Sequence, residues 1–402
     1  MQSLLTNRRA GRLALATLAV GFVAAVAGPL NPPAGPVAPP PGPGPRTASN
    51  DANTPGDADS LFKITQPGSY YLTGNITGVT GKHGIEIAAS GVTIDLNGFS
   101  LLGLSSASAF DGIAVSTPNL SAITIRNGSI RNWGDDGVDL RSVFIAGTAI
   151  IDVRAADNVD VGIAASDNAV INGCSATNNG TGIFVSANST IVGCAALQNT
   201  TTGIRTSSGA TISSSTSVNN GGDGFSIANG STITGCSAFF NSGNGIVASF
   251  GSSITACSTY DNDLNGIVAG SGCTVSGCTA RLNTLDGIRI NSDCVVLNNA
   301  CSTNGNSAGD GAGIHVLGSD NRIEGNNCSF ADRGIDIDFA GNIIIRNTCS
   351  GNTVDWDIVA NNIYGPIIDR RIPSPLPNTP AVSGTAAAST LGSTDANANF
   401  TY

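Results

Sequence analysis

Apolar and polar positions alternate in a short phrase that recurs along the middle of the chain. In TGIFVS, DGFSIA and NGIVAS, the residues one and three places after the glycine are apolar or small, whereas those two and four places after it vary. A period of two predicts a β-strand with one buried face and one exposed face. The glycine recurs every 21 residues through this block, at Gly182, Gly203, Gly224, Gly245, Gly266 and Gly287.

Each repeat also contains a second predicted strand, whose inward column includes Ile191, Ile212 and Ile233. A repeat of this length is too short for two strands and a covering helix. We therefore expect an all-β solenoid, in which every strand stacks in parallel on its copy in the next coil. Looser copies of the phrase extend the array to about 13 coils; they lie at Gly84, Gly112, Gly137, Gly313 and Gly334 and in residues 355–360.

Asparagines occupy a fixed phase of the repeat, close before the glycine. Stacked side-chain amides can hydrogen-bond along the solenoid axis, as they do in cross-β ladders. The alternative, ordinary turn asparagines, explains the residue type but not its constant phase. We expect a ladder formed by Asn158, Asn178, Asn199, Asn220, Asn241, Asn262 and Asn283.

The ten cysteines also fall in columns, the longest of which begins at Cys174 and Cys194 and ends at Cys278. An exported protein with this many cysteines would commonly form disulfides. However, stacked side chains point in parallel, and that orientation suits the S–S dihedral poorly. We therefore expect buried thiols. The absence of a C-x-x-C pair and of histidines at ligand spacing predicts no metal site.

The two ends of the chain differ in composition from the repeats. Residues 1–27 have the charged start, apolar centre and Ala-x-Ala end of a secretory signal peptide, with an uncleaved anchor as the alternative. Residues 28–56 are a Pro/Gly-rich linker, and residues 366–402 are expected to be an extended or disordered tail. The solenoid should occupy residues 57–365 and begin with a capping strand pair. The prediction is an exported protein, either secreted, periplasmic or at the cell surface, without membrane insertion after cleavage.

The repeated phrases, together with VTIDLNGF at residues 92–99, resemble the right-handed parallel β-helix repeat family, which has the pectate-lyase-like fold. The resemblance covers residues 57–365. It implies a right-handed winding, which is also the general hand of parallel crossovers, and a tendency to act on or bind polysaccharides. The family includes lyases, hydrolases, epimerases and phage tailspikes, so the fold does not select an activity.

The charge balance narrows the classes of partner. The chain has 28 acidic residues against 18 Lys and Arg, and its net charge at pH 7 is −10. This argues against nucleic acid and anionic membranes, and it disfavours strongly anionic glycans unless a local basic groove or bound Ca²⁺ assists. A polysaccharide is the expected partner. No cofactor is expected, although a lyase could use Ca²⁺, and nothing in the sequence specifies an oligomeric state.

The strongest candidate catalytic residues lie two places after the glycine in the late repeats. This outward position is occupied in successive coils by Arg289, His315, Asp336 and, in the degenerate last copy, Asp357, and Asp338 lies beside them. A histidine, carboxylates and an arginine on adjacent coils suit acid/base cleavage of a glycosidic bond or Ca²⁺-assisted elimination. The alternative is a solvated stack of alternating charges.

A second candidate region lies in the early coils, where the loops are longer. An aromatic ring beside carboxylates and arginines would suit a groove that binds sugars. The candidate substrate-binding residues are Arg126, Arg131, Trp133, Asp135 and Asp136. A stacked column of Asp95, Arg126 and Asp152 is also expected, because each follows a strand isoleucine; an ion-pair ladder is the alternative interpretation.

The motifs of known β-helix enzymes are mostly absent. Gly134-Asp135-Asp136 resembles the G-D-D element of polygalacturonases, but N-T-D, G-H-G and R-I-K do not accompany it, and the D-P-H element of alginate epimerases is missing. We therefore expect a non-catalytic exported rod that binds carbohydrate; the alternative is a polysaccharide lyase or glycoside hydrolase. Carboxylates around a concave groove would favour the enzyme, and a closed ladder of ion pairs would favour the rod.

Overall fold

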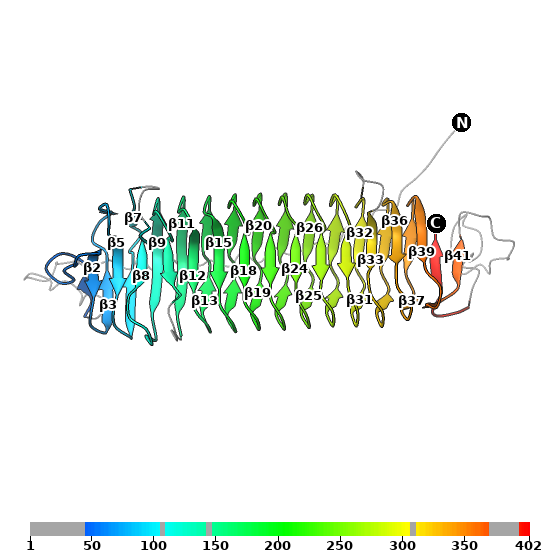
Figure 1. Ribbon diagram of the computed structural model, residues 1–402, viewed down its shortest axis with the longest axis horizontal. Helices are drawn as coiled ribbons and strands as arrows, with labels where there is room; N and C mark the ends of the chain where they lie inside the picture. The colour runs from blue at the N-terminus through cyan, green and yellow to red at the C-terminus, as the bar shows by residue number, and fades with distance from the viewer. Residues whose placement is uncertain (1–44, 105–108, 142–146, 306–310, 370–393) are drawn as a thin grey trace, which may run out of the picture. The chain divides into compact units, whose positions relative to one another are not determined.

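The computed structural model describes residues 45–104, 109–141, 147–305, 311–369 and 394–402. These residues belong to one compact unit, Pro45–Tyr402, and they form strands and turns without a helix among them. The coils of this unit stack in parallel, as the alternation predicts (Figure 1). The expected signal peptide, residues 1–27, lies outside the described residues.

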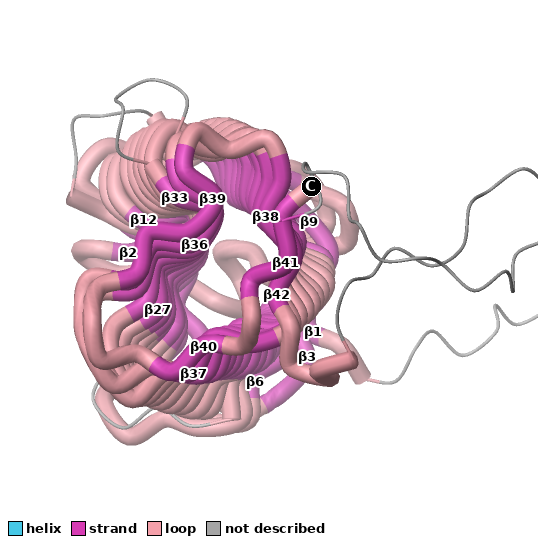
Figure 2. Tube along the Cα trace, turned by 90° about the vertical axis from the view of Figure 1, so that its right-hand side faces the viewer, coloured by secondary structure: helices cyan, strands magenta, loops and turns pink. Residues whose placement is uncertain are grey.

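Each coil contributes strands to three faces, which surround a shared core (Figure 2). Face 1 is a parallel sheet of 14 strands, and the extra coil beyond the expected array begins before Gly84. Face 1 consists of β2 (Ser60–Ile64), β5 (His83–Ile87), β8 (Ile113–Val115), β10 (Val138–Leu140), β12 (Val161–Ala165), β15 (Thr181–Val185), β18 (Ile204–Thr206), β21 (Phe225–Ile227), β24 (Ile246–Ala248), β27 (Ile267–Ala269), β30 (Ile288–Ile290), β33 (Ala312–Val316), β36 (Arg333–Ile337) and β39 (Val354–Ile358).

Faces 2 and 3 are joined into one 28-stranded sheet, because β9 (Thr124–Arg131) and β11 (Ala149–Ala156) continue through the corner between them. Face 2 consists of β3 (Gly68–Tyr71), β6 (Val92–Asp95), β13 (Val170–Asn172), β16 (Thr190–Val192), β19 (Thr211–Ser213), β22 (Thr232–Thr234), β25 (Ser253–Thr255), β28 (Thr274–Ser276), β31 (Val295–Leu297), β34 (Arg322–Glu324), β37 (Ile343–Ile345) and β40 (Ile363–Tyr364). Face 3 consists of β4 (Ile76–Thr77), β7 (Ser100–Leu102), β14 (Ser175–Thr177), β17 (Ala195–Leu197), β20 (Thr216–Val218), β23 (Ser237–Phe239), β26 (Ser258–Tyr260), β29 (Thr279–Arg281), β32 (Ala300–Ser302), β35 (Asn327–Ser329), β38 (Thr348–Ser350), β42 (Asn399–Thr401) and β41 (Ile367–Asp369).

The core is built from inward side chains that stack on their own copies. Ile191, Ile212 and Ile233 are paired in register and fully buried. Each such side chain contributes about 1.5–3 kcal/mol through burial. Because every coil repeats the same inward positions, the core continues without interruption from the early coils to the late ones.

Buried polar ladders run along the corners beside this core. The Asn199 side-chain oxygen accepts hydrogen bonds from the backbone N–H and the side-chain amide of Asn179, at 3.0 and 3.2 Å. The ladder continues through Asn220 and Asn241 to Asn304 and confirms the expected asparagine stack. One member was predicted wrongly: Asn179 is in the ladder and Asn178 is outside it. The reason is that the turn before Gly182 is one residue shorter than the corresponding turns in the neighbouring coils.

The ten cysteines are free and buried, as expected from their columns. The longest column is itself a hydrogen-bonded ladder. The Cys194 N–H donates to Ser215 Oγ at 3.1 Å, and the Ser215 N–H donates to Cys236 Sγ at 3.5 Å. Asn299 continues the column after Cys278, whose N–H it accepts at 2.8 Å.

The ends of the stack are paired. The leading strands β2 and β3 belong to the first coil, since they pair in parallel with β5 and β6. The strand β1 (Thr47–Ala48) pairs with β3, and Pro55 bridges Phe62. At the other end β42 pairs with β38 and β41. Both described ends of the segment expected to be a tail, residues 366–402, are therefore strands of the sheet.

Candidate functional site

One outward column runs the full length of face 1 and includes both a late and an early group of charged residues. Its register brings Arg289, His315, Asp336 and Asp357 onto adjacent coils, as the glycine spacing predicts. The column reads Lys63, Glu86, Ala114, Asp139, Ala164, Phe184, Arg205, Ser226, Val247, Val268, Arg289, His315, Asp336 and Asp357.

The expected column of Asp95, Arg126 and Asp152 forms only in part. Asp95 is paired with Arg126, and their side chains form an ion pair at 3.1 Å. Ile151, however, lies opposite Arg126, and Asp152 is displaced into the corner with a φ of 52°. The expectation for Asp152 was wrong because the strand contains two successive isoleucines, and the first of them is the inward residue.

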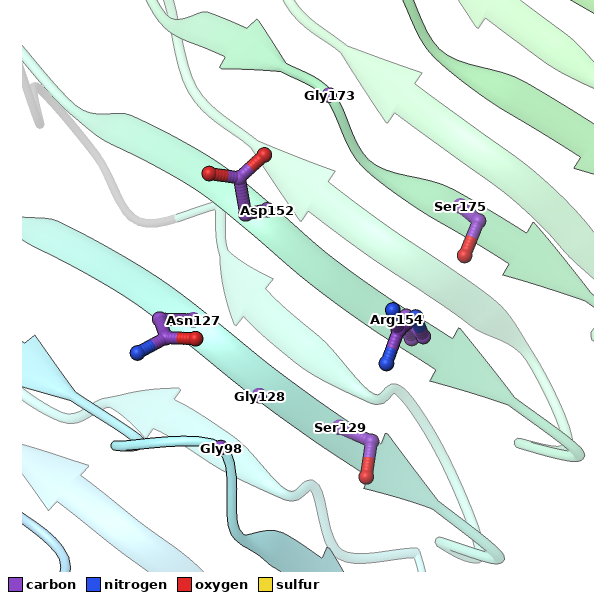
Figure 3. Close-up of a pocket in the computed structure, with 8 residues that line it drawn as sticks. All are labelled: Gly98, Asn127, Gly128, Ser129, Asp152, Arg154, Gly173 and Ser175. Carbon is purple, nitrogen blue, oxygen red and sulfur yellow. The ribbon is translucent and has the colours of Figure 1, made fainter.

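A hollow of ≈ 360 Å³ lies at this corner, on the outward side of β9 and β11 (Figure 3). Asp152 and Arg154 are its charged residues. The remaining lining is small or polar and lacks an aromatic ring; it consists of Gly98, Asn127, Gly128, Ser129, Gly173 and Ser175. Arg126 and Arg131 are not among these lining residues.

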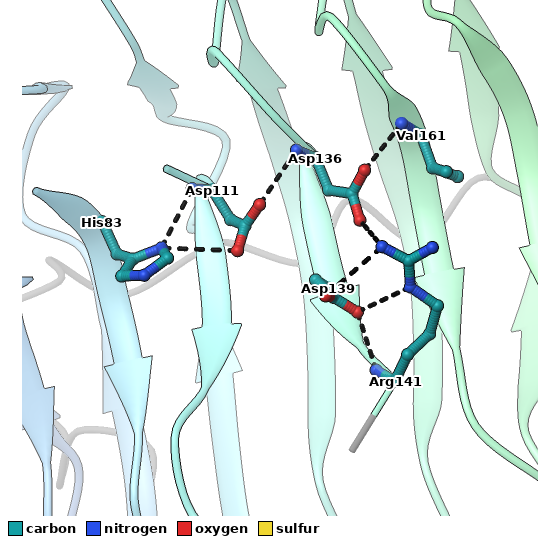
Figure 4. Close-up of polar contacts among 6 residues, drawn as sticks. All are labelled: His83, Asp111, Asp136, Asp139, Arg141 and Val161. Atoms are coloured by element: carbon teal, nitrogen blue, oxygen red, sulfur yellow. Dashed lines mark hydrogen bonds and ion pairs between the residues drawn. The ribbon is translucent and has the colours of Figure 1, made fainter. Parts of the chain in front are cut away.

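The early end of face 1 carries a chain of polar contacts at its loop edge (Figure 4). The Asp111 backbone N–H donates to His83 Nδ1 at 2.9 Å, and Asp111 Oδ1 accepts the Asp136 N–H at 2.9 Å. Asp136 Oδ1 accepts the Val161 N–H at 2.7 Å, while Oδ2 contacts Arg141. These carboxylates therefore satisfy the backbone between coils.

Asp136 is fully buried, and Asp135 and Asp160 lie close to it. Burial raises the pKa of Asp136 to about 8, although the Val161 N–H and the Arg141 charge oppose this. Burial, together with the Asp111 and Asp160 charges, also raises the pKa of Asp135. One oxygen from each of the three carboxylates lies within 4.8 Å of the others. The predicted Asp135/Asp136 region is therefore a real cluster, but one of its two members is closed to solvent.

Trp133 does not offer its ring to solvent. Its exposed fraction is 3%, and its indole Nε1 donates to the Leu101 carbonyl at 3.4 Å. Gly84 and Gly112 from the neighbouring coils leave space for the ring, because a Cβ at either position would lie within 3.0 Å of it. The expectation that Trp133 lines a sugar groove was wrong, since the glycines accommodate it in the core.

A second hollow, of ≈ 240 Å³, opens on face 1 immediately after this early cluster. The Arg205 guanidinium on β18 lies over the Phe184 ring on β15, with the guanidinium carbon 5.8 Å from the ring centre. Arg141, Asp160, Val161 and Thr181 complete the lining. Sequence reasoning missed this hollow; the signal was an aromatic residue beside an arginine at the same outward position of successive repeats.

At the late end of face 1, His315 is surrounded by carboxylates. Its Nδ1 lies 3.0 Å from Asp286 Oδ2, and its Nε2 lies 3.2 Å from Asp338 Oδ2 and 3.8 Å from Asp336 Oδ2. Burial opposes protonation, but the hydrogen bond and charge of Asp286, with help from Asp338 and Asp336, raise the pKa of His315 to about 9.

Arg333 adds a positive charge to this late group. It lies 3.5 Å from Asp336 and donates to Asp357 at 3.0 Å. Burial raises the pKa of Asp336, while the His315 and Arg333 charges oppose the shift. The predicted residues are therefore brought together as a closed ladder of ion pairs, to which Asp286 adds a member that the sequence analysis did not include. Arg289 lies next in the column on the exposed side.

These features define a parallel β-helix with charged groups on one outward face. The family model for the right handed beta helix region matches residues 67–211, 111–256 and 204–354, and the chain belongs to this family. No curated protein matches the sequence. Among the described residues, none forms a helix that could cross a lipid bilayer.

Two solved structures with the same fold are Azotobacter vinelandii mannuronan C-5 epimerase A-modules. The AlgE6 A-module has a TM-score of 0.52 and 17% identity, over 74% of this chain and 88% of that chain. The AlgE4 A-module has a TM-score of 0.51 and 15% identity, over 74% of this chain and 91% of that chain. At these identities the likeness shows the fold alone.

Proposed function

We propose that this protein is an exported, non-catalytic β-helix that binds a polysaccharide along face 1. The observation that carries the proposal is the pairing of Phe184 with Arg205 at the mouth of the ≈ 240 Å³ hollow. The hollow takes one sugar unit of the chain, and the neighbouring outward positions of face 1 contact the units on either side.

The lining supplies the contacts that a sugar ring uses. The C–H face of a pyranose stacks on an aromatic ring such as Phe184. The Arg205 and Arg141 guanidiniums donate to hydroxyl or carboxylate oxygens in a fixed planar geometry. Asp160 accepts from hydroxyl groups, and the Thr181 hydroxyl can donate or accept. Arg205 adds positive charge to the hollow, whereas Arg141 is already paired with Asp136 and Asp139.

The arrangement of the carboxylates supports binding without cleavage. His315, Asp336 and Asp357 are occupied by mutual ion pairs and by Arg333. The Asp135, Asp136 and Asp160 oxygens lie within 4.8 Å of one another. This spacing is much shorter than the ~6.5–9.5 Å that inverting glycosidases leave between their two carboxyl groups for a water molecule.

A polysaccharide lyase or glycoside hydrolase is the second candidate. It is favoured by one observation, the position of Asp160 both in the lining of the hollow and beside Asp135. Burial and neighbouring charges raise the pKa of Asp135, and a carboxyl group that retains its proton can act as a general acid.

Export is supported by the signal-like composition of residues 1–27.

The test is a glycan-array screen of the purified full chain, combined with a reducing-end assay for cleavage. Phe184→Ala and Arg205→Ala should each weaken binding of the selected glycan at least about fivefold, since each removes a contact of about 1–3 kcal/mol. Arg289→Ala is the matched control, because Arg289 occupies the same column away from the hollow.

Binding that is unchanged in both hollow variants would contradict this placement of the site. Release of reducing ends that disappears in Asp135→Asn or Asp160→Asn would contradict the non-catalytic role and establish the second candidate.

A further inference from the structure

The late end of face 1 brings one imidazole and three carboxylates together from neighbouring coils. Asp286 precedes β30, His315 lies on β33, and Asp336 and Asp338 lie on β36 and directly after it. Ligand atoms of His315, Asp336 and Asp338 all lie within 4.8 Å of one another. This convergence is independent of the hollow at Phe184, which lies earlier in the column.

Asp286 is fixed by backbone contacts, so its free oxygen faces the histidine. Its N–H donates to Asn265 Oδ1 at 3.0 Å, and its Oδ1 accepts the Ala312 N–H at 2.9 Å. Only Oδ2 then faces His315 Nδ1, at 3.0 Å. A carboxylate in this position accepts the Nδ1–H hydrogen bond and directs the Nε2 lone pair outward. This is the arrangement that positions most metal-binding histidines.

The residue type at position 286 departs from the repeat in a way that serves this contact. Asn244 and Asn265 occupy the same position in the two preceding coils, where each accepts the backbone N–H of the next coil. An asparagine at 286 could accept the Ala312 N–H equally well. The carboxylate adds a second acceptor oxygen, and His315 is the group that this oxygen faces.

The distances suit a small metal ion. Two ligands bound at about 2.1 Å in tetrahedral geometry are separated by about 3.4 Å. The His315 Nε2 lies 3.2 Å from Asp338 Oδ2 and 3.8 Å from Asp336 Oδ2, so adjustments of a few tenths of an ångström would suffice. The Asp336 side chain is 7% exposed and that of Asp338 is 46% exposed. The cluster is therefore enclosed on one side and open to water on the other.

We propose that His315 Nε2, Asp336 and Asp338 bind one divalent transition-metal ion, with Asp286 as the positioning residue for His315. One imidazole with two carboxylates favours Zn²⁺, Mn²⁺, Co²⁺ or Fe²⁺. Ca²⁺ is disfavoured, because it takes six to eight oxygen ligands. The ion replaces a proton on Nε2 and adds positive charge among three carboxylates, of which Arg333 neutralises only part.

The test is isothermal titration of the chelator-treated full chain with ZnCl₂, MnCl₂ and CaCl₂, and the visible spectrum of the Co²⁺-loaded chain. One Zn²⁺ per chain should bind more tightly than Ca²⁺, and His315→Gln should abolish this binding. Asp286→Asn should weaken Zn²⁺ binding about 10–100-fold, as is typical when the partner of a metal-bound histidine is removed. Asp261→Asn is the matched control, since Asp261 is exposed, lies in an earlier coil and has a φ of 51° that asparagine tolerates; the Zn²⁺ affinity of this variant should be unchanged.

The Asp286→Asn variant also separates metal binding from folding. Because asparagine already occupies this position in the two preceding coils, the variant should keep the circular dichroism spectrum of the metal-free chain, while its melting temperature near neutral pH should fall with the loss of the Asp286–His315 ion pair. The proposal is wrong if no ion binds, or if Zn²⁺ binding survives His315→Gln or is unaffected by Asp286→Asn. In that case His315 and its carboxylate neighbours form only a set of ion pairs around a protonated imidazole.

Discussion

Asn158 and Asn179 form one rung of a buried ladder at the corner before face 1. The side-chain oxygen of Asn179 accepts the backbone N–H of Asn158 at 3.0 Å and its side-chain amide at 2.9 Å. The Asn179 amide in turn donates to the Ala155 carbonyl at 3.2 Å. A single side chain therefore satisfies three polar groups that are closed to water, where the chain turns and the strand ladder is interrupted.

Replacing Asn179 with alanine should lower the free energy of unfolding by about 2–4 kcal/mol. The substitution leaves buried donors and an acceptor without partners, and each unsatisfied group costs about 1–3 kcal/mol. The adjacent Asn178 provides the control, because it is outside the ladder and has a φ of 55°. Asn178→Gly should change stability by less than about 1 kcal/mol, since glycine adopts this conformation readily. Denaturant titration measures both, and equal effects would contradict the assignment of the rung.

The cysteines should all react as thiols, but only after unfolding. The ten are free, and all are buried, so a reagent in solution cannot reach them in the folded chain. A thiol reagent should label few or none of them in the folded chain and ten per chain in denaturant without reductant. A lower number in denaturant would show that disulfides form.

Serine should replace a cysteine of the long column at little cost. Ser215 already occupies one rung and makes the same contacts with Cys194 and Cys236. Cys236→Ser should therefore shift the free energy of unfolding by about 1 kcal/mol or less, because the hydroxyl keeps the hydrogen bond to the Ser215 N–H. Cys236→Leu, measured by the same thermal melt, should cost at least about 1–3 kcal/mol because the column has no room for added methylenes.

Because of Asp95, the stability of the early coils should decrease at acid pH. Burial opposes its ionisation, but the Asn97 N–H at 2.8 Å and the Arg126 and Arg46 charges outweigh burial and lower the pKa of Asp95. A lowered pKa contributes stability above the usual carboxyl range near pH 4, and this stability is lost as the pH falls through the folded-state value.

The matching experiment compares the wild type with Asp95→Asn. At about pH 7 the variant should be less stable by about 1–3 kcal/mol, because a charged acceptor is lost. At about pH 2 the difference should shrink, since the carboxyl is then protonated in the unfolded wild type and the advantage of the lowered folded-state pKa is being lost. Melting temperatures at the two pH values measure this, and a difference that does not depend on pH would show that the charge of Asp95 is unimportant.

The regular spacing of the repeats predicts much of the fold. It fails where a coil changes length and where the burial of a side chain depends on residues from other coils. The stacking of His315 on Asp336 and the ladder from Asn199 to Asn283 depend only on the period, and both are confirmed. Asn178 was placed in the ladder because one coil is a residue shorter than its neighbours.

Depth is a second property that spacing does not give. Trp133 is buried because glycines from other coils leave space for its ring, and nothing local to Trp133 reveals this. The Phe184–Arg205 hollow and the contact of Asp286 with His315 likewise depend on how far side chains from separate coils project. Asp286 and His315 are 29 residues apart, whereas the period is shorter, because an insertion lengthens the coil between them.

A single corner position offers a matched pair of substitutions with opposite expected signs. Gly235 and Gly277 adopt φ values of 59° and 63° at the corner between faces 2 and 3, and Ala256 adopts 51° at the same position of the intervening coil. An L-residue in this region costs about 1–2 kcal/mol, whereas glycine loses about 0.5–1 kcal/mol through backbone entropy. Ala256→Gly should therefore stabilise the protein by up to about 1 kcal/mol.

The reverse change, Gly235→Ala, should destabilise by a similar amount. A Cβ at Gly235 would meet no atom within 4 Å, so only the conformational cost enters. Ala256 is exposed, so its removal loses little packing. Denaturant titration of the two single variants and of the double variant should give changes of opposite sign that add to about zero, because neither substitution removes the hydrogen bond from the Gly235 N–H to the Thr255 carbonyl that links the two corners. If both single variants destabilise, packing rather than backbone conformation determines stability at this corner.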